Sequence, residues 1–254
     1  MPDPSIDQKI ETLYGAVDWS RASGCLHVAA IHGPTGSVIA LGPDAPRSTA
    51  DRFVLGFARA RARMIVTTGA ILRAEPDLEH RYAEDEESEA LFGEWRRRVL
   101  GEDDPPEVLV LTGTGVLDSA HPALTRAKGI LYTSRAGAER LGSAPDGFEV
   151  FVGASGGGAV QEAARFATLR AGSGSLLIEA GPTTSRSLYP DVTGESGVDE
   201  LLLSSFEGEL SPGAIGPLFI EAERIERRFG APVSSVVIEE PSGRWRFERY
   251  VSGR

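Results

Sequence analysis

Residues 176–185 read Leu-Leu-Ile-Glu-Ala-Gly-Pro-Thr-Thr-Ser and join a buried strand to a helix start through a glycine turn. The apolar residues before Glu179 predict a strand at 175–179, and Pro182 suits a first helical turn, where its missing N–H costs nothing. Backbone N–H groups at such a helix start can converge on an anion. An ordinary strand-to-helix turn without a ligand explains these residues equally well, because the turn by itself does not identify a ligand.

Short apolar runs alternate with helix-like stretches along the rest of the chain, which is the pattern of an α/β sheet. We expect strands at 26–31, 64–67, 108–112, 129–133, 149–152, 175–179, 200–205, 233–239 and 244–251. Helices are expected at 48–63 and 160–171, and a third begins at 183. Turn-forming residues at 240–243 should close an antiparallel hairpin. The predicted fold class is therefore α/β, with a mostly parallel central sheet, a C-terminal antiparallel hairpin and flanking helices.

The length of 254 residues suits one domain over 1–254. Residues 79–106 do not follow the alternation of strands and helices, and they are rich in Glu, Asp and Arg. This composition predicts a solvated helical insertion or a flexible loop. The glycine run at 153–158 lacks the ending of a phosphate-binding loop, so we interpret it as a flexible connection.

The composition excludes several classes of protein. With 26 Lys and Arg against 37 Asp and Glu, the net charge is −11, which disfavours nucleic acid and membrane surfaces as partners. A single cysteine, Cys25, cannot form an internal disulfide, and no apolar run approaches the roughly 20 residues of a spanning helix. The N-terminal residues show no targeting pattern, so we expect a soluble protein in the cytoplasm. The four histidines lack metal-ligand spacing, and no metal site is predicted.

The run from Glu179 to Thr183, followed by Gly-Val-Asp-Glu-Leu at 197–201, resembles the pattern E-[GA]-G-P-T…G-L-V-D-E-L of the riboflavin-pathway pyrimidine reductases. Thr-Ala-Asp-Arg at 49–52, Leu-Arg-Ala-Glu at 72–75 and Leu-Asp-Ser-Ala-His-Pro at 117–122 are similar to further motifs of that family. The resemblance implies a dihydrofolate-reductase-like fold, a homodimer and NADPH as the cofactor. It also implies a small-molecule substrate, a ribosylamino-pyrimidine phosphate that is reduced from the ribose to the ribityl form.

The resemblance further implies which residues meet the ligands. Cofactor phosphate would be held at the helix start by Gly181, Pro182, Thr183, Thr184 and Ser185. Gly69 and Glu75 would lie near the cofactor, with a surface acid as the alternative interpretation of Glu75. Glu179 would face the substrate, and it is the best-placed catalytic acid if burial raises its pKa.

Two other groups of residues could meet phosphate. Arg59 holds a family position from which its planar fork could bind the substrate phosphate, although most helix arginines are solvated. Thr112, Ser134 and Arg135 follow two successive strands, and ligands of open α/β sheets collect outside such carboxyl ends. Hydroxyls and an arginine suit the 2′-phosphate of NADPH, and helix capping at the surface is the competing interpretation.

Two departures from the family concern the ligand pocket. His32 stands where the family has an aspartate, which makes it a substrate-binding candidate whose charge depends on pH. Ala70 or Ile71 replaces a cofactor-facing threonine. These changes keep two alternatives open, namely a reductase of another pteridine- or pyrimidine-like compound and a nucleotide-binding homologue that has lost catalysis. Motifs of the deaminase domain that often accompanies this reductase are absent, so a stand-alone reductase is expected.

Overall fold

The computed structural model describes residues 4–21, 24–40, 42–153, 159–189 and 197–253. The strands are β1 Cys25–His32, β2 Ser37–Ile39, β3 Ala62–Thr68, β4 Glu107–Thr112, β5 Gly129–Thr133, β6 Phe148–Val152, β7 Ser175–Ile178, β8 Glu200–Phe206, β9 Ile215–Leu218, β10 Ser234–Glu240 and β11 Gly243–Val251. The helices are α1 Ile6–Tyr14, α2 Thr49–Arg61, α3 Gly69–Ala74, α4 Glu86–Leu100, α5 Pro122–Thr125, α6 Arg135–Leu141, α7 Ala159–Ala171, α8 Pro182–Ser185 and α9 Ala222–Phe229, with 3₁₀ turns at Arg186–Leu188 and Pro212–Ala214.

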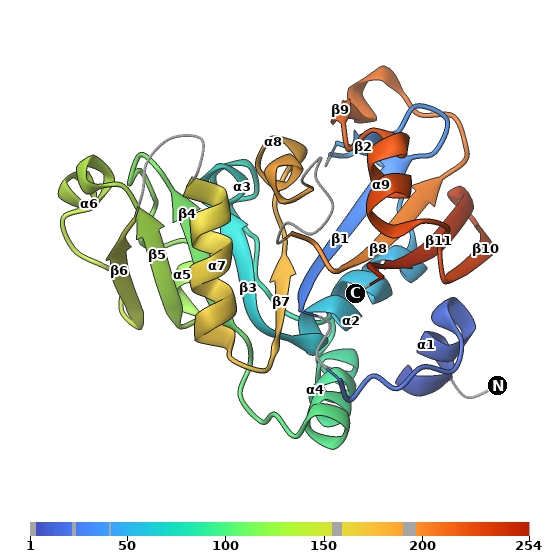
Figure 1. The fold of residues 1–254 in the computed structure, drawn as a ribbon, viewed down its shortest axis with the longest axis horizontal. Helices are drawn as coiled ribbons and strands as arrows, with labels where there is room; N and C mark the ends of the chain where they lie inside the picture. Colours follow the sequence, from blue (N-terminus) through green and yellow to red (C-terminus); the bar gives the residue numbers. More distant parts are fainter. Residues whose placement is uncertain (1–3, 22–23, 41, 154–158, 190–196, 254) are drawn as a thin grey trace.

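One sheet carries all of these strands, in the order β10-β11-β8-β1-β7-β3-β4-β5-β6, with β2 and β9 attached beside β1 (Figure 1). The seven strands from β8 to β6 run parallel, whereas β11 is antiparallel to β8 and to β10. The prediction of a mostly parallel sheet with a C-terminal antiparallel hairpin is thus confirmed. Because the parallel strands share one direction, their carboxyl ends meet at one edge of the sheet.

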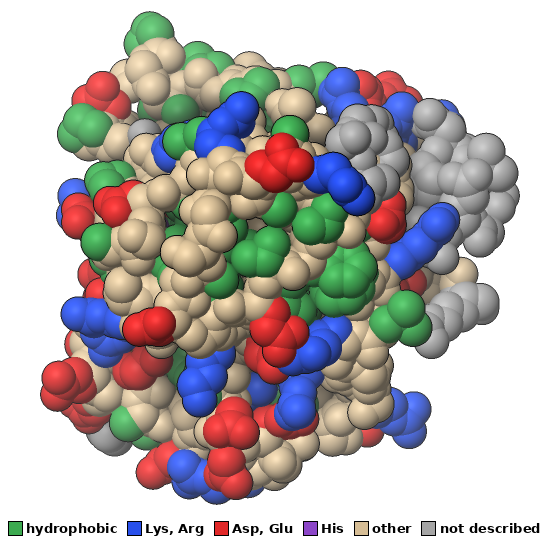
Figure 2. Space-filling model, turned by 90° about the vertical axis from the view of Figure 1, so that its left-hand side faces the viewer, with side chains coloured by type: hydrophobic (Ala, Val, Ile, Leu, Met, Phe, Trp, Pro, Cys, Tyr) green, Lys and Arg blue, Asp and Glu red, His purple; other side chains and the backbone are tan. Residues whose placement is uncertain are grey.

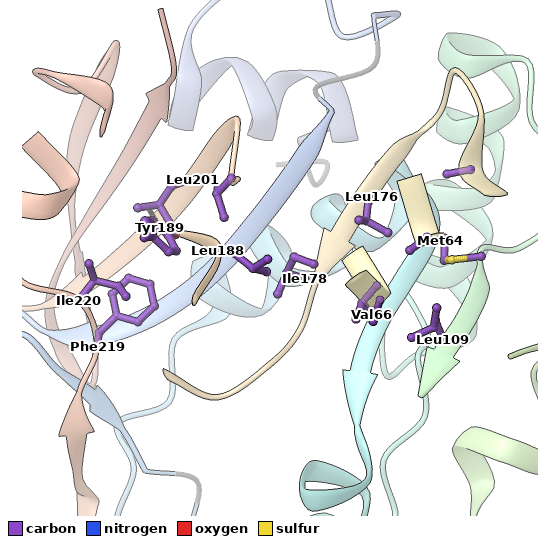
Figure 3. Close-up of a cluster of buried hydrophobic side chains, with 14 of the residues drawn as sticks. Met64, Val66, Leu109, Leu176, Ile178, Leu188, Tyr189, Leu201, Phe219 and Ile220 are labelled. Atoms are coloured by element: carbon purple, nitrogen blue, oxygen red, sulfur yellow. The ribbon is translucent and has the colours of Figure 1, made fainter. Parts of the chain in front are cut away.

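Helices cover both faces of the sheet (Figure 1), and alternate residues of each central strand supply the two cores. Met64 and Val66 of β3 pack on the α7 side, whereas Ile65 packs on the α2 side. Figure 3 shows side chains of β3, β4, β7 and β8 meeting in the first of these cores. The strands therefore read as continuous apolar runs, because both of their faces are buried.

Helix α2 delivers the chain directly into β3. Ser48 caps its first turn by accepting a hydrogen bond from the Asp51 N–H at 2.9 Å, and Val54 and Phe57 face the core. The next strand begins at Ala62, immediately after the helix ends at Arg61. This short connection fixes the end of α2 against the sheet.

The charged segment at 79–106 is packed more closely than its composition indicates. Its helix α4 begins after the Asp85 cap and is capped at its C-terminal end by Gly101, whose φ of 71° lies in the left-handed region that glycine tolerates. Phe92 and Trp95 are buried, and the Arg96 guanidinium donates to the carbonyls of Ala60 and Ala62. A flexible loop is therefore the wrong description of 86–100, because one face of this helix joins the core.

The far edge of the sheet is formed by β6, which exposes Val150, Phe151 and Val152. Figure 2, the view onto this side, shows hydrophobic side chains gathered in the middle of the face and charges of both signs around them. No helix in the described ranges is long and apolar enough to cross a membrane. Residues 154–158 of the glycine run lie outside the described residues.

Candidate active site

The carboxyl ends of β3, β4, β5 and β7 bring the predicted ligand residues to one edge of the sheet. Ile178 is in register with Val66 of β3, and the Glu179 N–H donates to the Val66 carbonyl at 2.8 Å. Thr68 is in register with Leu111, and Thr112 with Thr133. Residues separated by more than 100 positions in the sequence therefore form a continuous row at this edge.

Gly181 caps α8 with an ordinary backbone conformation, φ −61° and ψ 163°. Its carbonyl accepts the N–H groups of Thr184 and Ser185, each at 3.0 Å, and the Ser185 hydroxyl at 3.2 Å. Among the described residues, nothing lies within 4 Å of a Cβ placed on Gly181. The turn therefore presents open space at a helix start, although the buried Ser185 hydroxyl is already used inside it.

Gly69 is held in a much tighter place. A Cβ added there would lie 3.2 Å from Thr112 Oγ1 and 3.0 Å from Leu117 Cδ2. The Thr112 hydroxyl in turn accepts a hydrogen bond from the Gly115 N–H at 3.2 Å. Close packing between α3 and the end of β4 thus explains the glycine at 69 without any ligand.

Ser134 caps α6 by accepting the Gly137 N–H at 3.0 Å, and its hydroxyl donates to the Gly113 carbonyl at 2.9 Å. The capping interpretation of Ser134 is therefore correct, and a ligand role stays a prediction. The neighbouring Arg135 is exposed and makes no ion pair or side-chain hydrogen bond with any residue that the structure describes. Its guanidinium is available to an anion at this edge.

Arg59 and Glu179 are each other's partners. The Arg59 Nε and Nη2 atoms donate to the two carboxylate oxygens of Glu179, both at 2.7 Å. The remaining terminal nitrogen, Nη1, donates to the carbonyls of Glu79 at 3.3 Å and Arg81 at 2.8 Å. The guanidinium fork thus meets a protein carboxylate, and direct binding of a substrate phosphate by Arg59 stays a prediction.

This pairing sets the charge of Glu179. Burial raises the pKa of the Glu179 carboxyl, but the charge and hydrogen bonds of Arg59 outweigh burial, so the pKa is lowered overall. The condition for a general acid at Glu179, a pKa raised by burial, is therefore not met. An ionised Glu179 can orient a substrate or stabilise positive charge on it.

Glu75 lies near Glu179 and has the opposite shift. Burial raises the pKa of the Glu75 carboxyl and the Glu179 charge adds to the effect, while Arg59 and His121 oppose it. Two neighbouring carboxyls whose pKa values move apart are a common arrangement of acid and base groups in active sites. The family resemblance implied that Glu75 lies near the cofactor, and it did not indicate a proton donor at this position.

His121 fixes the segment that carries Glu75. Its Nδ1 atom accepts the Ala123 N–H at 3.1 Å, so the hydrogen is assigned to Nε2, which contacts the carbonyls of Leu72 at 3.0 Å and Glu75 at 2.9 Å. The Leu-Asp-Ser-Ala-His-Pro motif therefore has a structural role here, because it ties the end of α3 to the start of α5.

His32 also uses both ring nitrogens within the protein. Nδ1 lies 3.0 Å from the Thr35 hydroxyl and Nε2 lies 3.0 Å from the Gly208 carbonyl. The first contact lies in the turn between β1 and β2, where Gly36 has a φ of 66°, and the second joins this turn to the segment after β8. Contact of His32 with a substrate stays a prediction.

His80 was missed by the sequence analysis. Both ring nitrogens are buried and have no hydrogen-bond partner among the described residues. No pattern in the sequence marks this histidine, because its environment is made by Arg59 and Glu179 from distant elements. No group of three or more His, Cys, Asp and Glu side chains suited to a metal ion occurs among the residues described.

Known structures with a similar arrangement of strands and helices include pyrimidine reductases. One is a pyrimidine reductase-like protein from Corynebacterium diphtheriae, 20% identical over 97% of this chain and 99% of that chain, with a TM-score of 0.66. This chain has the pyrimidine reductase fold. No protein-family model matches it, and a search of curated proteins found no match.

Two further likenesses support the same fold. A diaminohydroxyphosphoribosylaminopyrimidine deaminase/5-amino-6-(5-phosphoribosylamino)uracil reductase from Thermotoga maritima is 14% identical, with a TM-score of 0.55 over 91% of this chain and 57% of that one. The riboflavin biosynthesis reductase of Saccharomyces cerevisiae is 8% identical, with a TM-score of 0.50 and 90% of both chains covered. This chain thus spans a little over half of the bifunctional enzyme.

Proposed function

We propose that this chain is an NADPH-dependent reductase of a ribosylamino-pyrimidine phosphate such as 5-amino-6-(5-phosphoribosylamino)uracil. One observation carries the proposal, namely the open turn at Gly181, two residues after Glu179, at the edge where β3, β4, β5 and β7 end. Ligands of open α/β sheets bind at such carboxyl ends, and a glycine turn that leads into a helix accepts phosphate. The pyrimidine reductase fold agrees with this assignment.

The residues at this edge fit a dinucleotide phosphate. Gly181 leaves the space that a pyrophosphate needs, and the exposed Thr183 offers its hydroxyl and an N–H that bonds to no described residue. Arg135, beyond the end of β5, pairs with no described residue and could bind the 2′-phosphate that distinguishes NADPH from NADH. When bound, NADPH would supply the hydride, and the protein would supply orientation and charge.

The substrate end calls for a proton as well as a hydride. Reduction of a ribosylamino to a ribitylamino group adds a hydride to the anomeric carbon and a proton to the ring oxygen that this carbon releases. Glu75, whose pKa is raised, is the better proton donor. Glu179, ionised beside Arg59, would stabilise the positive charge that develops when the sugar ring opens.

A direct test is to add 5-amino-6-(5-phosphoribosylamino)uracil and NADPH to the purified protein and follow oxidation of the cofactor. We expect turnover that needs both compounds and is slower with NADH. NADPH binding without turnover of this or related pyrimidines would favour a nucleotide-binding homologue that has lost catalysis. Absence of NADPH binding would refute the proposal.

A further inference from the structure

We propose that His80 is a substrate-binding residue whose imidazole receives an uncharged hydroxyl or amide group beside the Glu179 carboxylate. That this ligand is the substrate of a reductase rests on the function proposed above. The existence of a polar ligand at His80 rests on the structure around it.

Arg59 holds the backbone on both sides of His80. Its Nη1 atom binds the carbonyl oxygens of Glu79 and Arg81, while Nε and Nη2 bind Glu179. One buried guanidinium thus ties the segment that carries His80 to the end of β7. His80 is thereby fixed in place before any ligand arrives.

A glycine of α2 allows this segment to lie close. A Cβ on Gly56 would overlap the Tyr82 carbonyl oxygen. The chain at 79–82 is therefore pressed against α2 in a way that a larger residue at 56 would prevent. Close packing and the Arg59 contacts together make the position of His80 a defined feature of the fold.

The groups around the His80 ring are those of the candidate site. A cavity of about 490 Å³ between α2 and the chain at 77–88 is lined by Glu79, Arg81 and Tyr82, whereas His80 is not among its described lining residues. Glu179, Arg59 and His121 are instead the charged or titratable groups within electrostatic reach of the His80 ring. The His80 ring therefore lies within electrostatic reach of the carboxylate that borders the candidate site.

Both nitrogens of this imidazole are unsatisfied. They are shielded from solvent and have no hydrogen-bond partner among the described residues. A buried polar group without a partner costs free energy, and most buried polar groups in proteins are hydrogen-bonded. A ligand that binds beside Glu179 would supply the missing partner.

The chemistry of the ring selects the ligand. Burial lowers the pKa of His80 to about 4; the Glu179 charge opposes this shift, and Arg59 and His121 add to it. The ring is therefore neutral at neutral pH and offers one N–H donor and one lone pair. A sugar hydroxyl or the amide edge of a pyrimidine matches this pair, whereas a phosphate, which only accepts hydrogen bonds when fully ionised, does not.

Two substitutions separate this role from a structural one. His80→Leu removes both polar atoms, and we expect the KM of the substrate to rise roughly 5- to 100-fold, the equivalent of two neutral hydrogen bonds. NADPH affinity and thermal stability should not fall, because the buried unsatisfied nitrogens are gone. His80→Asn keeps a donor and an acceptor and should recover part of the loss. An unchanged KM in the folded His80→Leu protein would overturn the proposal.

A second measurement does not depend on activity. In the full-length protein with isotope-labelled histidine, the His80 ring signals can be assigned by their loss in His80→Asn. Uridine, which carries both sugar hydroxyls and an amide edge, should shift these signals, whereas inorganic phosphate alone should not. Unchanged His80 ring signals after addition of uridine would overturn the proposed site at His80. A shift with uridine in a protein that does not bind NADPH would uphold the site and refute the reductase function.

Discussion

The guanidinium of Arg59 donates a hydrogen bond to each oxygen of the Glu179 carboxylate, with both N···O distances at 2.7 Å, although the two residues are 120 positions apart in the sequence. Their side chains are only 8% and 11% exposed, so neither charge is well solvated. Each charge therefore depends on the other for its stabilisation. This pair fixes the ionisation of Glu179 and, through the Glu79 and Arg81 carbonyls, the position of His80.

Glu179→Gln should lower kcat by roughly 10²- to 10⁴-fold, the range of positioned acid–base groups, while NADPH affinity changes little. The amide keeps the size of the side chain and removes the charge that would stabilise the opening sugar. It also leaves Arg59 without an anion, so the melting temperature should fall. Steady-state kinetics and thermal unfolding check both effects, with Glu79→Gln as the control at a pair whose Arg126 side chain is exposed. Normal turnover would make Glu179 a structural residue.

Arg59→Lys keeps the charge but loses the two-pronged geometry and the carbonyl contacts of Nη1. We expect a higher KM and a loss of about 1–3 kcal/mol in unfolding free energy, because a buried carboxylate loses part of its pairing. Arg52→Lys on the same helix is the matched control, since its pair with Glu84 is exposed and should matter little. Equal denaturation midpoints for the two variants would contradict the importance given to the Arg59 pair.

Glu75 and Glu179 should respond to pH in opposite directions. Glu179 has a lowered pKa, so its ionised form stabilises the fold above the unfolded value of about 4.3, and this contribution is lost as the pH falls through the folded pKa. Glu75 has a raised pKa, so its contribution is complete below about 4.3 and is lost as the pH rises through the folded value. At pH 7, Glu75→Gln should therefore raise the melting temperature and Glu179→Gln should lower it.

The pH dependence of kcat tests whether Glu75 donates the proton. If this carboxyl donates the proton, kcat should decline as the pH rises through its pKa, and Glu75→Gln should be slow at every pH and lack that decline. A pH–rate profile of both proteins measures the difference. The same high-pH decline in the variant would assign the proton to another group.

Arg135→Ala should reduce the preference for NADPH over NADH by roughly 10- to 100-fold, the equivalent of one charged hydrogen bond. Arg140→Ala is the control on the same helix, because Arg140 is exposed and its guanidinium already bonds to the Thr114 carbonyl. The ratio of the NADPH and NADH affinities, measured by fluorescence titration, shows whether Arg135 binds the 2′-phosphate. A ratio unchanged in Arg135→Ala would remove this residue from the cofactor site.

Most of the sheet could be predicted from the sequence, because strands buried on both faces are continuous apolar runs. The strands expected at 108–112 and 129–133, for example, occur at 107–112 and 129–133. Two short strands, Ser37–Ile39 and Ile215–Leu218, were missed. They are partly or largely exposed, and they form by pairing with each other and, for Ser37–Ile39, with β1, so no local apolar pattern marks them.

The site was predictable only in part. The glycine turn at 181 is a local pattern and was found, and Arg59 and Glu179 were both singled out. That they bind each other could not be read from the sequence, because their contact depends on how α2 packs against β7. The same packing creates the environment of His80 and shifts the pKa of Glu75.

The most direct test of the account is the affinity for NADPH of Gly181→Val beside the wild-type protein. A Cβ at this position meets no described atom within 4 Å, so we expect the variant to fold normally, yet its side chain would fill the space proposed for the pyrophosphate. Gly93→Val is the control, because Gly93 is equally unobstructed but lies on α4, at the opposite end of the fold from α8 (Figure 1). We predict that Gly181→Val loses most of its NADPH affinity and that Gly93→Val keeps it. Equal NADPH affinity in the two folded variants and the wild type would contradict the cofactor site at this turn.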